Sequence, residues 1–138
     1  MCMVGTVGGL TERKELVMEK DDAIYLAGLF DGEGCVYFKY RYRRRKARSG
    51  TYAWCNELVC RLQLEMSCKE TINHVKNITK CGTVWMRKPR RSSLGTLCKQ
   101  MYIWVGSHRD ANKVAKHITP FAITKQNKLL EIVNHYVN

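Results

Sequence analysis

The chain has 138 residues, of which 45% are hydrophobic, and this fits one compact domain that buries its own core rather than two domains. Lys and Arg number 24 against 12 Asp and Glu, so the formal charge of +12 points to a polyanionic partner, nucleic acid before an anionic membrane. No apolar run reaches the roughly 18 residues of a membrane span, and residues 1–10 do not resemble a signal peptide. We expect a soluble, intracellular protein, with cytoplasm, organelle and phage-infected cell all open.

The cysteines and histidines do not form a metal-binding pattern. Seven cysteines without a C-x-x-C pair indicate reduced thiols that mostly pack. The four histidines lie far apart in the sequence, at spacings that do not predict a zinc site.

Residues 1–20 are weakly patterned, and we interpret them as an N-terminal arm leading into a single domain over residues 21–138. The domain begins with a short helix. Asp21 or Asp22 serves as its N-cap, and the helix runs from Ala23 to Phe30 and ends near Gly32.

The first predicted helix contains small residues in its middle and acidic residues at its C-terminal end. Ala27 and Gly28 carry almost no side chain, which allows a second helix to approach closely. Asp31 and Glu33 follow at the end where the helix dipole is negative and repels them. A bound cation would reverse that repulsion and use the helix-end carbonyls as ligands, so the pattern indicates a metal.

Two alternating runs follow and predict a long antiparallel hairpin. Apolar side chains such as Val36 and Phe38 share one face with Leu58, Leu62 and Leu64, while basic and polar side chains occupy the other face. Residues 44–50 between the runs form a charged, turn-forming tip.

The remaining chain predicts a second helix, a second hairpin and two further helices. Ser67 to Glu70 reads as a capping box for a helix that stops at Gly82. Strands are expected over residues 83–88 and 97–105. Ser107 caps a helix that Pro120 ends, and Thr124 caps the last helix. The predicted fold class is α+β with the order αββαββαα.

The stretch from Leu26 to Gly34 resembles the LAGLIDADG motif of homing endonucleases. It matches the motif at these positions: Leu26, Ala27, Gly28, Leu29, Asp31 and Gly34. The resemblance implies the same element order, with a curved antiparallel sheet that forms a saddle over DNA. It also implies a site-specific endonuclease that cuts both strands of a long, pseudo-palindromic double-stranded site. Because the chain has one copy of the motif, we expect a homodimer packed through the motif helix at Ala27 and Gly28.

In that family the concave sheet face lies in the major groove, where arginine, glutamine and glutamate can distinguish bases. Alternation, together with the basic tips, assigns these residues to DNA binding: Tyr37, Lys39, Arg41, Arg43, Arg44, Arg45, Arg61, Gln63, Glu65, Thr83, Trp85, Arg87, Arg90, Arg91 and Lys99. The tip arginines are expected on phosphates rather than bases. A merely solvated, charged sheet face is the alternative.

The resemblance also implies the active site. Glu33 is the acidic metal ligand, where the family more often has Asp, and the backbone carbonyl of Gly32 lies beside it. The metal is Mg²⁺ or Mn²⁺, held by hard oxygen ligands. Lys125 matches the basic residue near the scissile phosphate, and Asp31 has a local structural role. A further polar residue follows the second strand, with Ser67, Cys68 and Lys69 all open.

Two other functions on the same fold stay open. One is an intron-encoded RNA maturase, and the other is a DNA-binding regulator that does not cleave. Glu33 and Lys125 argue against a purely structural role for the motif.

Overall fold

A computed structural model describes residues 17–137 of the chain. Most of the expected N-terminal arm lies outside the described residues. Its expected end at residue 20 is one residue too late, because Lys20 already belongs to the first helix.

The elements follow the order predicted from the sequence. They are α1 (Lys20–Glu33), β1 (Gly34–Lys46), β2 (Tyr52–Met66), α2 (Lys69–Thr79), β3 (Thr83–Arg87), β4 (Met101–Ser107), α3 (Arg109–Ile118), a 3₁₀ turn (Thr119–Phe121) and α4 (Gln126–Val137). The α+β class and the αββαββαα order are therefore confirmed. None of the described helices has the length and apolar character needed to cross a bilayer.

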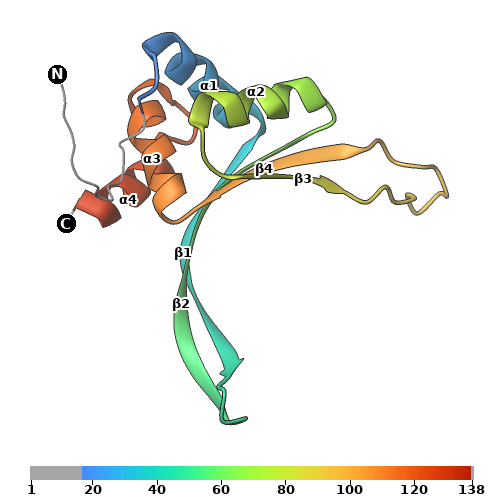
Figure 1. The fold of residues 1–138 in the computed structure, drawn as a ribbon, viewed down its shortest axis with the longest axis vertical. Coiled ribbons are helices and arrows are strands. Elements are labelled where there is room, and N and C mark those ends of the chain that lie inside the picture. The colour runs from blue at the N-terminus through green and yellow to red at the C-terminus, as the bar shows by residue number, and fades with distance from the viewer. Residues whose placement is uncertain (1–16, 138) are drawn as a thin grey trace, which may run out of the picture.

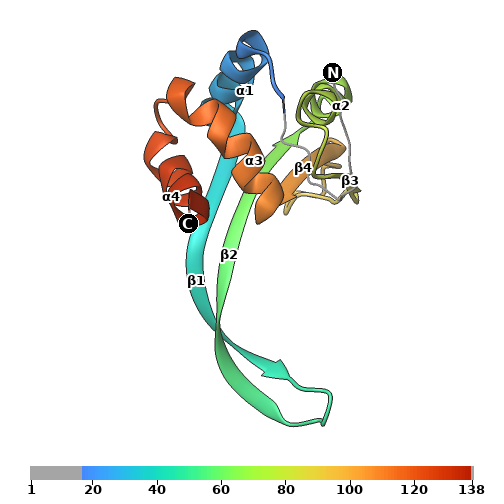
Figure 2. The ribbon, with the colours of Figure 1, turned by 60° about the vertical axis from the view of Figure 1, so that its left-hand side comes forward.

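The four strands form one antiparallel sheet in the order β1-β2-β4-β3. The β1–β2 hairpin and the β3–β4 hairpin leave the helical body in different directions, so the sheet is strongly bent, and the helices gather over one of its faces (Figure 1). Turning the molecule shows the long β1–β2 hairpin curving well beyond the helices (Figure 2). No helix of residues 17–137 covers the other face of the sheet.

The core lies between the helices and the even-numbered face of β2. Leu62 and Leu64 are fully buried there, as the alternation predicts, together with Trp104 of β4. The ring of Phe30 from α1 meets Trp104 edge to face, with centroids 6.0 Å apart. Each such side chain contributes about 1.5–3 kcal/mol through burial, so this contact anchors α1 on the sheet.

Two helices begin differently from the sequence prediction. The N-cap of α1 is Glu19, and Asp21 and Asp22 lie in the first turn, where acids favour the positive end of the helix dipole. The N-cap of α2 is Cys68, without a side-chain cap bond, so the capping box at Ser67 is wrong. The reason is that β2 extends to Met66, which leaves Ser67 in the bend before the helix.

The second hairpin also differs from its prediction. β4 begins at Met101 rather than at residue 97, because its pairing with β2 runs only from Ser107 opposite Arg61 to Tyr102 opposite Met66. Ser107 is therefore a strand residue, and His108, with φ of 51°, takes the N-cap of α3. Lys99 consequently lies in the β3–β4 loop and not on a strand.

Candidate nucleic-acid interface and active site

The C-terminal end of α1 is held firmly and passes into β1 without a linker. Leu26, Ala27 and Phe30 are fully buried on the inner side of the helix. The backbone N–H of Gly34 donates to the carbonyl of Phe30. A Cβ at Gly34 would lie 2.3 Å from Cδ1 of Phe30, so the close approach requires glycine. Glu33 is thus fixed as the last residue of the helix, with its side chain exposed.

Asp31 ties this helix end to a distant segment. Its carboxylate accepts the backbone N–H of Ile123 at 2.8 Å and that of Lys125 at 3.0 Å. Partial desolvation raises the pKa of Asp31, but these amide donors and the Lys125 charge outweigh it, and the pKa lies below its ordinary value. The structural role expected for Asp31 is therefore observed, but it joins distant segments and is not local.

Lys125 reaches the same helix end through its side chain. Its Nζ donates to the carbonyl oxygens of Phe30, at 3.1 Å, and Asp31, at 3.3 Å. An ammonium group is favourable there because the carbonyl end of a helix carries partial negative charge. Lys125 precedes α4, so it is not a first-turn residue of that helix. The structure therefore brings Glu33 and Lys125 to one end of α1 although 92 positions of sequence separate them.

The oxygen donors at this end fit a small, hard cation. Glu33 offers an exposed carboxylate, and the carbonyl of Gly32 is among the last of a helix, which lack amide donors four residues further on. Within residues 17–137 no three His, Cys, Asp or Glu side chains gather as a metal site. Mg²⁺ commonly takes one or two protein oxygens and completes its shell with waters and substrate phosphates, so the donor set fits Mg²⁺ better than zinc.

The three candidates for the further polar residue lie together at the start of α2. Ser67, Cys68 and Lys69 are all exposed. The sulfur of Cys68 accepts a hydrogen bond from Thr71 at 3.1 Å and its thiol lies 3.7 Å from a carboxylate oxygen of Glu70. The assignment of an active-site role among the three stays a prediction.

The strand register places most of the predicted readers on one face. Tyr37 pairs with Arg61, whose guanidinium carbon lies 4.6 Å from the centre of the Tyr37 ring. Gln63 and Thr83 both pair with Val105. Residues that pair across a ladder project to the same side, so the odd-numbered residues of all four strands share the face that the helices leave uncovered. We call this the concave face.

A cluster of charged side chains dominates the concave face of the β1–β2 hairpin. Arg41 donates to Glu57 at 2.9 and 3.0 Å, Arg43 donates to it at 3.3 Å, and Arg45 forms a third ion pair with the same carboxylate. The hydrogen bond from Arg41 is the main reason that the pKa of Glu57 is lowered. Glu57 was not among the predicted site residues. The hairpin register, in which Arg41 lies opposite Glu57, is the signal that would have found it.

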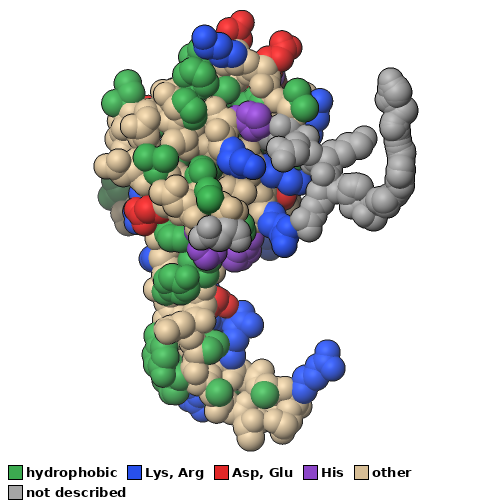
Figure 3. Space-filling view, turned by 90° about the vertical axis from the view of Figure 1, so that its left-hand side faces the viewer, with side chains coloured by type: hydrophobic (Ala, Val, Ile, Leu, Met, Phe, Trp, Pro, Cys, Tyr) green, Lys and Arg blue, Asp and Glu red, His purple; other side chains and the backbone are tan. Residues whose placement is uncertain are grey.

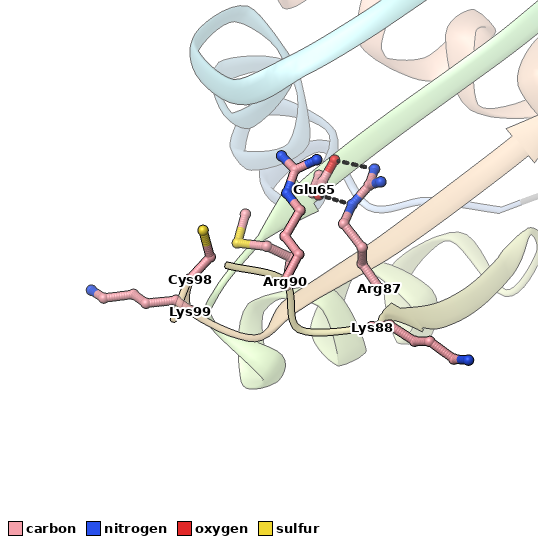
Figure 4. Close-up of a pocket in the computed structure, with 7 residues that line it drawn as sticks. Glu65, Arg87, Lys88, Arg90, Cys98 and Lys99 are labelled. Atoms are coloured by element: carbon pink, nitrogen blue, oxygen red, sulfur yellow. Dashed lines mark hydrogen bonds and ion pairs between the residues drawn. The ribbon is translucent and has the colours of Figure 1, made fainter. Parts of the chain in front are cut away.

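A second ion pair bridges β2 and β3. Arg87 donates to Glu65 through two nitrogens, at 2.7 and 3.0 Å, and this raises the pKa of Arg87. Figure 4 shows the pair at one side of a pocket whose other basic side chains come from the β3–β4 loop. The pocket is lined by Glu65, Arg87, Lys88, Arg90, Cys98, Lys99 and Met101. Lys99 and Arg90 thus contribute positive charge beside the concave face although neither lies on a strand.

Two of the predicted DNA contacts lie off the concave face. Arg44 projects to the opposite side from Arg43 and Arg45, and its guanidinium carbon lies 4.1 Å from the centre of the Tyr52 ring. The even-numbered residues of β1 face the helices, so Arg44 cannot join Arg45 on the concave face. Arg91 lies in the β3–β4 loop, where its Nη1 donates to the carbonyl of Gly95 at 3.0 Å.

The expected helix contact at Ala27 is also wrong. Ala27 has no exposed surface because it packs inside the protomer's own core. The outer side of α1 instead presents Gly28, which has open space around a built Cβ, and the half-exposed Ile24 and Tyr25. A close contact with another helix would therefore use Ile24, Tyr25 and Gly28.

Comparison with solved structures identifies the fold. An archaeal intron-encoded homing endonuclease complexed with DNA superposes with a TM-score of 0.60 at 16% identity, over 84% of this chain and 67% of that one. The homing endonuclease I-CvuI, in complex with a DNA target and Mg, superposes with a TM-score of 0.58 at 16% identity, over 81% of this chain and 63% of that one. I-LtrWI, a LAGLIDADG homing endonuclease bound to target DNA, superposes with a TM-score of 0.54 at 17% identity, over 91% of this chain and 39% of that one.

The architecture is thus the LAGLIDADG homing endonuclease fold. The chain spans less than two thirds of the length of I-CvuI. Comparison by sequence alone finds no matching family model and no matching curated relative.

Proposed function

We propose that this chain is one subunit of a site-specific DNA endonuclease that cuts both strands of a long, pseudo-palindromic duplex with the help of a divalent metal. The observation that carries the proposal is the bond from Lys125 to the carbonyl end of the helix that terminates at Glu33, from which β1 leads directly into the basic concave face. The DNA bound by the structural neighbours supports duplex DNA as the ligand.

The protein residues divide the chemical work. Glu33 and the carbonyl of Gly32 would hold Mg²⁺ or Mn²⁺, which supplies a Lewis acid that activates water and stabilises charge on the departing oxygen. Lys125 places a positive charge beside the same helix end, where it favours an incoming phosphate. Asp31 keeps Lys125 in place by holding its backbone amide.

The concave face would bind the duplex and read its sequence. Arg41, Arg43 and Arg45 carry guanidinium groups that pair with phosphate oxygens or guanine edges, and Gln63 can pair with adenine. Because a major groove admits a two-stranded ribbon, the long β1–β2 hairpin has a suitable form for following it.

A homodimer completes the site in this proposal. One protomer offers one Glu33, and a second copy packed on Ile24, Tyr25 and Gly28 of α1 would bring a second Glu33 toward the other DNA strand. A two-fold symmetric protein favours a pseudo-palindromic target.

The test is a selection of cleavage sites. The purified protein is incubated with a pool of duplexes of random sequence in Mg²⁺, and the broken ends are sequenced, with a parallel binding selection in Ca²⁺. We expect breaks in both strands at one long site with near two-fold symmetry. Specific binding without any cleavage in Mg²⁺ or Mn²⁺ would indicate a DNA-binding regulator, and preferential binding of structured RNA would indicate a maturase.

A further inference from the structure

The β1–β2 hairpin has a second exposed face, opposite the Glu57 cluster. Four of its aromatic side chains are half or more exposed: Tyr40 at 63%, Tyr42 at 65%, Tyr52 at 54% and Trp54 at 59%. They lie on the side that packs against the helices nearer the body of the protein, but beyond the point where helices cover it. Figure 3 shows hydrophobic side chains gathered along the hairpin below the helical body. We call Tyr40, Tyr42, Arg44, Tyr52 and Trp54 the aromatic face.

The rings of the aromatic face are ordered relative to one another. Tyr42 and Trp54 are stacked, with centroids 5.3 Å apart and planes 8° from parallel. One step further along the hairpin, the guanidinium of Arg44 lies over the Tyr52 ring, and Nζ of Lys46 lies 5.9 Å from the centre of the same ring. Flat rings therefore alternate with positive charges toward the tip.

The charge on this side has one sign. Between Tyr40 and Leu58, which the structure describes throughout, the residues that share the face include Arg44 and Lys46 and no acid. The opposite side of the same hairpin neutralises part of its charge through Glu57. A partner for the aromatic face should thus offer flat surfaces for stacking and negative charge for Arg44 and Lys46.

An unpaired nucleic-acid strand combines these two properties. Its bases expose π-faces that stack on Tyr and Trp, and its phosphates pair with cations. A duplex does not fit, because its base faces are already stacked on one another. An apolar protein surface does not fit either, because it would bury Arg44 and Lys46 without partners at a cost.

We propose that the aromatic face binds a single unpaired strand of DNA or RNA, separately from the duplex on the concave face. The strand would stack bases on Tyr42 and Trp54 and place phosphates near Arg44 and Lys46. This goes beyond the proposed endonuclease function, since neither Glu33 nor the concave face takes part.

The test measures binding of labelled oligothymidylate and oligouridylate of about 12 nucleotides, a length within the usual range of roughly 4–16 nucleotides for such sites. Trp54→Ala should weaken the binding of both about tenfold, which corresponds to about 1.4 kcal/mol and to the loss of one stacked base. Trp54→Phe keeps a ring and should retain most of the affinity. Duplex binding should change less than twofold in either variant, roughly the level of experimental scatter.

Arg45→Ala is the matched control, because Arg45 lies one residue from Arg44 but on the concave face. It should weaken duplex binding and leave oligothymidylate binding unchanged, whereas Arg44→Ala should do the reverse. Circular dichroism and thermal melting check that the hairpin is intact in each variant. Stronger binding of oligouridylate would assign the site to RNA, and stronger binding of oligothymidylate would assign it to DNA.

Two results would overturn the proposal. One is single-strand binding that Trp54→Ala leaves unchanged, which would place the strand on the concave face. The other is an equal loss of duplex and single-strand binding in a folded Trp54→Ala variant, which would make the aromatic face part of the duplex site. Neither result depends on cleavage, so the endonuclease proposal is tested independently.

Discussion

The end of α1 and the outer part of the β1–β2 hairpin are built in opposite ways. The helix end is fixed by buried Leu26 and Phe30 and by the bonds of Asp31 and Lys125 to distant backbone. The hairpin from residue 40 to residue 58 extends past the core, and its side chains are held mainly by one another. Groups that act on one phosphate gain from fixed positions, whereas a surface that fits a groove gains from side chains that can rearrange.

The largest expected effect follows from removing the charge at the fixed end. Glu33→Gln should lower cleavage at least about 100-fold, because changes even to groups that only orient metal ligands cost 10–100-fold. Duplex affinity should stay within about threefold, since phosphate contacts on the concave face supply most of it. The measurement is cleavage in Mg²⁺ beside binding in Ca²⁺.

Glu131→Gln is the matched control, because Glu131 is exposed on α4 and forms a weak surface pair with Lys128 at 3.9 Å. A Glu33→Gln protein that cuts at the normal rate would show that Glu33 is not the metal ligand.

The second prediction concerns the exposed side of α1 at Gly28. Gly28→Arg should leave the protomer folded, because nothing lies within 4 Å of a Cβ built there. It should prevent two α1 helices from meeting and so abolish cutting of both strands. Light scattering at micromolar concentration, with and without DNA, reports the assembly state.

Asn73→Arg adds the same charge to an exposed site on α2 and serves as the control. A Gly28→Arg variant that still forms dimers would contradict the use of this side of α1. The wild-type protein as a persistent monomer of 16.0 kDa on its target would contradict the homodimer itself.

The third prediction loosens the fixed end without touching the metal ligand. Asp31→Asn should cost about 1–3 kcal/mol, because it weakens charge-assisted bonds to two backbone amides. Cleavage should fall about 10–100-fold through misplacement of Lys125. Asp21→Asn, in the exposed first turn of α1, should cost less than about 1 kcal/mol.

The same variant has a defined pH dependence. The pKa of Asp31 is lowered in the folded protein, so its ionised form stabilises the fold above the ordinary value of 3.8. That stabilisation is lost as the pH falls through the lower folded-state pKa. The melting temperatures of wild type and Asp31→Asn should therefore converge below pH 3.8, and a constant difference would contradict the assignment.

The smallest effect is expected on the hairpin. Glu57→Gln removes the carboxylate shared by Arg41, Arg43 and Arg45, which leaves them freer to reach phosphates. Affinity for random duplex should rise about threefold and discrimination of the selected site should fall, since electrostatic pairing sets specificity as well as attraction. Titrations at several salt concentrations measure the affinity and the discrimination.

Glu19→Gln, at an exposed acid before α1, is the control. A loss of affinity for random duplex in Glu57→Gln would show that Glu57 chiefly organises the arginines for binding.

The sequence predicts the two faces of the hairpin because strand side chains alternate with a period of two. It could not establish that Arg41, Arg43 and Arg45 converge on one carboxylate, since that depends on the register around Ser49 and Gly50. The start of β4 was misplaced for a related reason. Residues 97–100 contain no β-branched or aromatic side chain, and β2 ends before it can pair with them.

Small residues were the other source of error. Ala27 fits equally well against a second helix or inside the protomer's own core, and the sequence does not distinguish these environments. The contact of Asp31 with Ile123 joins residues 92 positions apart, so its geometry depends on the whole fold. The local motif indicates where the candidate site lies, but only the packing shows which of its residues face inward.

Because α1 passes directly into β1 at Gly34, the spacing between the helix end and the first strand residues is short and fixed by the chain. Glu33, the proposed metal ligand, and Tyr37, the first proposed DNA contact of β1, are four residues apart across the junction of α1 and β1, a span of at most about 13 Å at 3.3 Å per strand residue. In the proposed endonuclease, the covalent chain would therefore set the distance from the bases that β1 contacts to the bond that is cut. One residue inserted after Gly34 would lengthen this spacing by one residue. It would also turn the side chains of β1 that are proposed to contact DNA to the opposite face of the sheet.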